Sequence, residues 1–139
     1  MPRVIINGVG SYLPEKVVKN EDFLDSEFFQ EDGKPFPMSN EVIIEKFEKI
    51  TGIKERRYAL PGQLCSDLAT EAARQALKNS TVDQEDLDYI IFAQNFGELD
   101  DESNLVDVMP SLAGRVKNRL GIKNPEVTCY DLVFGCPGW

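Results

Sequence analysis

The sequence contains no histidine. Histidine is the side chain that most often acts as the general base beside a nucleophilic cysteine. A cysteine–histidine mechanism therefore cannot be completed within these 139 residues. If the chain takes part in such chemistry, the histidine has to come from outside this sequence.

Cysteine is also scarce, with only Cys65, Cys129 and Cys136 present. The number is odd and the chain is not a small, cysteine-dense one, so we expect no disulfide framework. No two cysteines form a CxxC pair, which argues against a zinc site. The acidic run at 98–102 lacks the glycine and the ligand spacing of a calcium loop and predicts a solvated loop. We therefore expect no metal and no cofactor.

Basic residues and long apolar runs are few. Lysine and arginine together number 15 against 24 acidic residues, and the net charge of −9 argues against a nucleic-acid partner. The apolar run at 4–6 is far too short for a signal sequence or a membrane span. We therefore expect no membrane association, and the reducing cytoplasm is the default location.

What is present is an alternation of strand and helix patterns. Apolar runs predict strands at 4–6, at 89–93 with both faces covered, and at 127–133, and an extended segment at 53–58. Helical spacing predicts helices opened by Asn20, Ser39 and Ser66 and another over 109–120, with Gly52 and Gly121 ending two of them. Residues 31–37 read as an inserted surface loop. This order predicts a three-layer α/β unit with a largely parallel sheet.

The last dozen residues carry the strongest candidate for chemistry. The strand at 127–133 is followed by Gly-Cys-Pro-Gly at 135–138, where Pro137 suits the first position of a helix and Cys136 the N-cap. Unpaired amides and the positive end of the helix dipole favour the thiolate form of such a cysteine. Cys136 is therefore a candidate nucleophile, the alternative being a small buried apolar residue.

The sequence stops three residues after Cys136, before a helix could complete its first turn. A buried strand seldom closes a domain in this way. We therefore expect residues 1–139 to be the N-terminal half-domain of a longer protein whose C-terminal half is not in this sequence.

Taken together, the motifs resemble a known family. They are GVGSYLP at 8–14, TGIKERR at 51–57, SDLA at 66–69 with EAA at 71–73, LGIK at 120–123, YD at 130–131 and GCPG at 135–138. Their order and spacing are similar to those of the N-terminal half of the β-ketoacyl-[acyl-carrier-protein] synthase III group of the thiolase superfamily. The resemblance implies an α/β thiolase-like fold, one half of an αβαβα layered sandwich.

The resemblance also implies a mechanism. Cys136 takes an acyl group from an acyl-CoA or acyl carrier protein thioester for decarboxylative condensation with a malonyl thioester, in fatty acid or related biosynthesis. In the family, a histidine and an asparagine of the second half assist, the enzyme is a cytoplasmic homodimer, and no cofactor is needed. On this reading residues 1–139 alone are inactive. The alternatives are a non-catalytic dimerisation partner, whose known relatives lack the cysteine, and a thioester hydrolase using Cys136.

Some positions depart from the family pattern or remain open. The tryptophan and arginine that clamp the CoA adenine in the family fall on Lys46 and Ile50, which favours a carrier-protein donor or a different CoA pose. Met109 stands where the family often has a phenylalanine reaching the partner's acyl pocket, and its alternative is a core residue of the helix over 109–120. Arg56 is a candidate for binding a CoA or phosphopantetheine phosphate.

For Arg56 and its neighbour Arg57, the alternative is a structural ion pair with one of the many acids. Lys54 reads as a surface charge.

Overall fold

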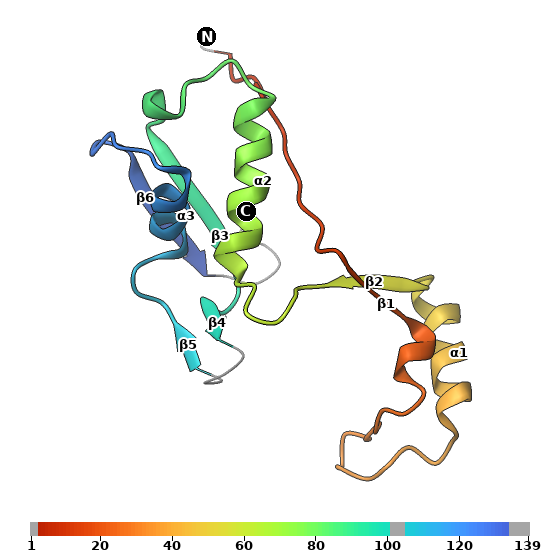
Figure 1. The fold of residues 1–139 in the computed structure, drawn as a ribbon. Helices are drawn as coiled ribbons and strands as arrows, with labels where there is room; N and C mark the ends of the chain where they lie inside the picture. The colour runs from red at the N-terminus through yellow and green to blue at the C-terminus, as the bar shows by residue number, and fades with distance from the viewer. Residues whose placement is uncertain (1–2, 101–104, 134–139) are drawn as a thin grey trace. The chain divides into compact units, whose positions relative to one another are not determined.

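The computed structural model of the protein describes residues 3–100 and 105–133. The chain divides into two compact units, one made of Met1–Leu13 with Pro61–Trp139 and the other of Pro14–Leu60. Figure 1 shows the elements of each unit. We describe the two units separately.

The first unit is built around two parallel strands, β3 (Tyr89–Gln94) and β6 (Thr128–Val133). Their register pairs Tyr89 with Thr128 and Gln94 with Val133. Helix α3 (Leu112–Leu120) packs on this pair and on helix α2 (Cys65–Lys78). The parallel pairing and the helix in its connection agree with the strand and helix patterns. The predicted largely parallel sheet is wrong for the described residues, because the other two strand pairs are antiparallel.

Three smaller elements complete the first unit. A short helical turn, η2 (Gln84–Asp86), precedes β3, and an antiparallel hairpin of β4 (Glu98–Asp100) and β5 (Leu105–Asp107) follows it. The buried apolar residues gather on and around α3 and β6: they are Leu112, Ala113, Val116, Ile122 and Val127.

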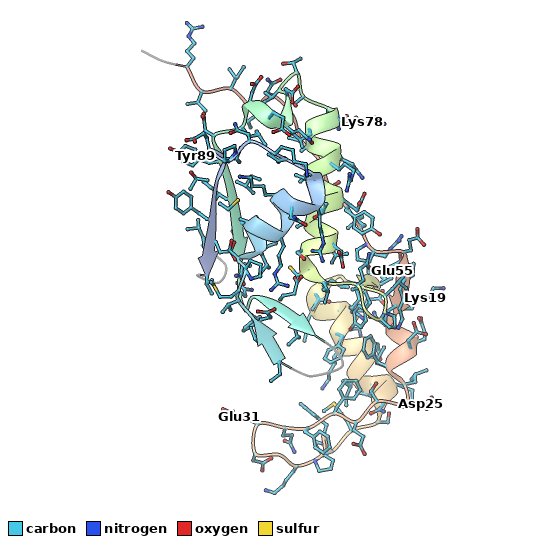
Figure 2. The ribbon with its side chains drawn as sticks, turned by 60° about the vertical axis from the view of Figure 1, so that its left-hand side comes forward. Lys19, Asp25, Glu31, Glu55, Lys78 and Tyr89 are labelled. Atoms are coloured by element: carbon cyan, nitrogen blue, oxygen red, sulfur yellow. The ribbon has the colours of Figure 1, made fainter. Side chains whose placement is uncertain are left out.

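One face of the β3–β6 pair is bare in the part of the chain that the structure describes. Tyr89 and Ile91 are 60% and 62% exposed, whereas Ile90 and Phe92 alternate with them on the half-buried face toward the helices. Tyr89, at the start of β3 (Figure 2), stacks on Tyr130 with ring centroids 6.1 Å apart. The prediction of a strand covered on both faces is therefore wrong for residues 3–100 and 105–133, because the packed helix covers only one face.

The predicted strand at 4–6 is also wrong, since residues 3–14 carry no helix or strand. A strand needs a partner for its ladder, and the described residues offer this segment none. Instead it runs against α2, where a side chain at Gly10 would overlap the backbone of Ala72 and Ala76. Asn79 adds a hydrogen bond of 3.0 Å from its side-chain amide to the carbonyl of Val9. Glycine thus permits a close approach to an alanine-rich helix.

Two predicted helix starts are displaced. Helix α2 begins one residue before Ser66, with Leu64 as its N-cap and the Leu64 amide donating to Asp67 at 2.9 Å. In the second unit, Asn20 is the first residue of a short helical turn, η1 (Asn20–Phe23), and not its cap. Ser66 and Asn20 are both buried and bonded to distant residues, so long-range contacts decide their roles.

The second unit joins an antiparallel pair, β1 (Lys16–Lys19) and β2 (Glu55–Tyr58), to η1 and helix α1 (Asn40–Thr51). Ser39 is the N-cap of α1 and Gly52 ends it in the left-handed conformation at φ 69°, as predicted. The segment containing Glu31 (Figure 2) is a surface loop, held by an isolated bridge between Phe29 and Pro35.

Candidate functional site

Glu98 lies in the middle of a buried polar cluster of the first unit, which we call the Glu98 cluster: Ser66, Glu98, Arg115 and Arg119. Glu98 is only 2% exposed. Its carboxylate accepts the Ser66 amide at 2.9 Å and the Ser66 hydroxyl, and it lies 3.8 Å from the guanidinium groups of both Arg115 and Arg119. The prediction of a solvated acidic loop is therefore wrong at this residue. Two cations and two donors offset the cost of burying the charge.

Arg115 connects this cluster to the turn that carries Met109. Its guanidinium donates to the carboxylate of Asp107 at 2.6 Å and to the carbonyls of Pro110 and Met109 at 3.0 and 3.2 Å. Asp107 in turn accepts the Met109 amide at 3.1 Å. Hydrogen bonds from the Arg115 side chain and from the Met109 amide, in that order of weight, lower the pKa of the Asp107 carboxyl below its usual value. Both the amide and the carbonyl of Met109 are thus hydrogen-bonded, to Asp107 and to Arg115.

Met109 itself lies before α3, which begins at Leu112 after the N-cap Ser111. The helix cannot include it because Pro110 interrupts the pattern and the Ser111 hydroxyl caps the helix by accepting the Gly114 amide at 3.1 Å. The Met109 side chain is 77% exposed. The alternative that Met109 is a core residue of a helix over 109–120 is therefore wrong, and its role in an acyl pocket stays a prediction.

Asp131, on β6, joins three elements of the first unit. Its two carboxylate oxygens accept the amides of Leu112 and Ala113 at the start of α3, both at 2.8 Å, and the side-chain amide of Gln94 on β3 at 3.2 Å. Gln94 also accepts the Gly97 amide in the turn after β3. The strand that leads toward Cys136 is therefore bonded to the helix that follows the Met109 turn.

The sequence alone indicates that Asp131 needs hydrogen-bond partners. The residue is an acid inside an otherwise apolar strand, between Tyr130 and Leu132. A half-buried carboxylate in such a place requires hydrogen-bond donors. The sequence indicates the need for donors but not that the start of α3 supplies them.

Cys136 lies outside the described residues, three positions after the end of β6 in the sequence. The carboxyl ends of β3 and β6 meet at one edge because the two strands are parallel. At the end of β3 the structure has a cavity of about 440 Å³, lined by Cys65, Ala93, Gln94, Asn95, Phe96, Gly97 and Leu99. Sites in parallel α/β sheets lie at such edges.

The two other cysteines are poor nucleophiles. Cys65 is exposed at the surface, but desolvation by the groups around its sulfur, with a smaller contribution from the Glu98 charge, raises the pKa of its thiol. Burial also raises the pKa of the Cys129 thiol, with Asp131 adding to the effect and Lys117 opposing it. Neither thiol gains the thiolate character that covalent catalysis needs.

We therefore expect iodoacetamide at pH 7 to alkylate Cys65 and Cys129 more slowly than an unperturbed thiol. A raised pKa lowers the thiolate fraction at neutral pH, so their alkylation rates should reach their plateau only at more alkaline pH. Peptide mapping by mass spectrometry over a pH series measures each rate. Alkylation of Cys65 before Cys136 at pH 7 would contradict this assignment.

Arg56, in the second unit, is half-buried and engaged by neutral groups. It donates to the side-chain oxygen of Asn20 at 2.9 Å, and its guanidinium carbon lies 5.1 Å from the centre of the Phe23 ring. Arg57 donates to the carbonyl of Pro14 at 3.4 Å. Within residues 3–100 and 105–133, neither arginine has a carboxylate within ion-pair distance, so the alternative of structural ion pairs is wrong there. A phosphate-binding role for Arg56 stays a prediction.

The positions that correspond to the adenine clamp lie on α1. Lys46 reaches the Met38 sulfur at 3.5 Å, and Ile50 is 80% exposed. Lys54 is an exposed charge, 3.7 Å from Glu48, as predicted for a surface residue.

None of the helices in the described parts of the chain has the length and apolar character needed to cross a membrane. Within the same residues, no group of three or more histidine, cysteine, aspartate or glutamate side chains is placed to hold a metal ion.

The sequence and the fold are similar to those of known proteins. No protein-family model matches the chain. Among curated proteins, the β-ketoacyl-[acyl-carrier-protein] synthase III of Fusobacterium nucleatum subsp. nucleatum is 36% identical over 139 residues, and that of Caldanaerobacter subterraneus subsp. tengcongensis is 39% identical over 134 residues. The chain resembles the N-terminal part of synthase III. It spans 35% and 34% of these two relatives, about a third of their length.

Solved structures of synthase III share the fold. The enzyme from Thermus thermophilus superimposes with a TM-score of 0.70 at 31% identity, over 98% of this chain and 35% of its own. The enzyme from Aquifex aeolicus gives 0.68 at 32% identity, over 96% of this chain and 35% of its own. The predicted fold class, a thiolase-like α/β fold forming one half of an αβαβα sandwich, is confirmed.

Proposed function

We propose that residues 1–139 are the N-terminal half-domain of a longer acyl-condensing enzyme of the 3-oxoacyl-[acyl-carrier-protein] synthase III type. The observation that carries this proposal is similarity to synthase III along the whole chain, which includes the Gly-Cys-Pro-Gly sequence at 135–138, shortly after β6 in the sequence. The bonds of Asp131 support it, because they fix β6 against α3 and the end of β3.

In the proposed reaction, the Cys136 thiolate attacks the carbonyl carbon of an acyl thioester. The C–S bond of the donor breaks, the donor leaves as a thiolate that takes a proton from water, and the acyl group is held on Cys136. A malonyl thioester then loses CO₂, and the carbanion left behind attacks the acyl-enzyme carbonyl. A new C–C bond forms, the 3-oxoacyl thioester is released, and the Cys136 thiolate is regenerated.

Two further components belong to this proposal. A histidine and an asparagine from the C-terminal half assist decarboxylation, since the present sequence has no histidine. The Cys136 amide contributes to an oxyanion hole, a kind of donor whose loss costs roughly 3 kcal/mol. No cofactor takes part in either step.

The proposed partners are acyl-CoA or acyl carrier protein thioesters and a second copy of the enzyme, in the cytoplasm. The exposed Met109 side chain is available to enter the acyl pocket of that second copy, and methionine adapts well to chain-like ligands. Arg56 has no carboxylate partner among the described residues and is the proposed contact for a phosphate of the donor.

The test is an assay of the full-length protein with acyl-CoA, with and without malonyl carrier protein. We expect a 3-oxoacyl product that requires the malonyl thioester, and an acylated Cys136 peptide when it is omitted. Residues 1–139 alone should give no turnover. Release of free acid without a new C–C bond would instead indicate a thioester hydrolase, and no reaction with an intact dimer would indicate a non-catalytic partner.

A further inference from the structure

The guanidinium of Arg115 holds the Met109 turn through several hydrogen bonds. It donates to the carbonyls of Met109 and Pro110 and to the Asp107 carboxylate, which itself accepts the Met109 amide. One side chain therefore bridges both ends of the segment from Asp107 to Pro110. The backbone of this segment is fixed, although the Met109 side chain is exposed.

The Glu98 cluster holds Arg115 from the other side. The Arg115 side chain is only 18% exposed, and its guanidinium lies 3.8 Å from the buried Glu98 carboxylate. Ser66 orients that carboxylate from α2 through its amide and its hydroxyl. The guanidinium of Arg115 thus lies beside the buried Glu98 carboxylate and donates its other hydrogen bonds to the turn. The position of the Met109 backbone is therefore fixed relative to the core of the first unit.

We propose that Arg115 is a positioning residue that sets acyl-chain selectivity by fixing the backbone of Met109. This inference rests on the proposed function, in which the Met109 side chain bounds an acyl pocket. A small displacement of a group that bounds a substrate pocket changes which substrates fit productively. Lysine cannot replace Arg115, because its ammonium is a point charge and cannot span three acceptors as the planar guanidinium does.

The experiment compares Arg115→Lys, Met109→Ala and the double variant in the full-length enzyme. The readout is the ratio of kcat/KM values for a short and a medium acyl-CoA donor. We expect Arg115→Lys to change this ratio by about 5-fold, which is less than the roughly 10-fold or more that a whole methylene produces, because the variant displaces the Met109 side chain without removing it. In the Met109→Ala background, Arg115→Lys should change the ratio by less than about 2-fold, since the side chain it positions is absent.

Arg74→Lys is the matched control. Arg74 is an exposed arginine of α2 whose ion-pair partner is Glu71 at 3.5 Å, and it is not a member of the Glu98 cluster. It should leave the ratio unchanged. If Arg115→Lys does not fold, Asp107→Asn takes its place: Asp107 is exposed, and the variant weakens the same turn, so the ratio should shift in the same direction by a smaller factor.

An unchanged ratio in a folded Arg115→Lys variant overturns the inference. So does an equal change in Arg74→Lys, or a full effect that persists in the Met109→Ala background. These outcomes differ from a failure of the proposed function, which would appear as condensation that survives loss of the Cys136 thiol.

Discussion

Cys136→Ser is expected to lower the rate of 3-oxoacyl product formation by at least about 10³-fold, as removal of a covalent nucleophile does in other enzymes. A serine hydroxyl is not ionised near neutral pH, and it is a weak nucleophile unless a neighbouring base activates it. The measurement is product formation by the full-length enzyme, with detection of the acylated peptide by mass spectrometry.

Cys129→Ser is the matched control for that substitution. Cys129 is half-buried on β6, its pKa is raised, and it pairs in register with Ile90, away from the carboxyl end of the strand. The rate of product formation by Cys129→Ser should stay within about 2-fold of that of the unmodified enzyme, because the substitution is mild and lies away from the proposed nucleophile. Product formation by Cys136→Ser above a tenth of the normal rate would exclude Cys136 as the acyl carrier.

Asp131→Ala is expected to lower the free energy of unfolding by about 3 kcal/mol, because it removes an acceptor from several donors at once. The amides of the buried residues Leu112 and Ala113 lose their partner, and so does the side chain of Gln94. Urea unfolding of the full-length protein measures the change. Product formation should fall with it, since β6 and the start of α3 lose the carboxylate that joins them.

Two variants sharpen this second test. Asp131→Asn keeps one oxygen acceptor but turns an NH₂ group toward donors, so its loss of stability should be intermediate. Asp88→Ala removes an exposed acid directly before β3 and should stay within about 0.5 kcal/mol of the unmodified protein. A loss below 1 kcal/mol for Asp131→Ala would contradict the role assigned to this carboxylate.

The elements that the sequence predicted well are those fixed by local signals. Strands β3 and β6 are apolar runs bounded by turn residues, and α1 and α3 end at Gly52 and Gly121, whose φ angles are 69° and 79°. These signals act within a few residues, and glycine is the residue that adopts such backbone angles without strain. The order and spacing of the motifs, which resemble those of synthase III, predict the thiolase-like fold.

The features that the sequence could not reveal depend on distant partners. Glu98 reads as one acid in an acidic run, and its burial depends on Ser66, 32 positions away. Residues 4–6 have the composition of a strand, but a strand also requires a neighbour to pair with. Met109 fits the helical spacing of the residues after it, yet Pro110 and the cap Ser111 separate it from α3.

The bonds of Asp131 have a consequence for how phosphorylated molecules approach the first unit. Helix N-termini commonly attract phosphate groups, because their amides lack partners. At the start of α3 the first two amides already donate to an internal carboxylate and the third donates to Ser111. A phosphate group therefore finds the first three amides of α3 already occupied, so this helix end is not an anion-binding site of the first unit.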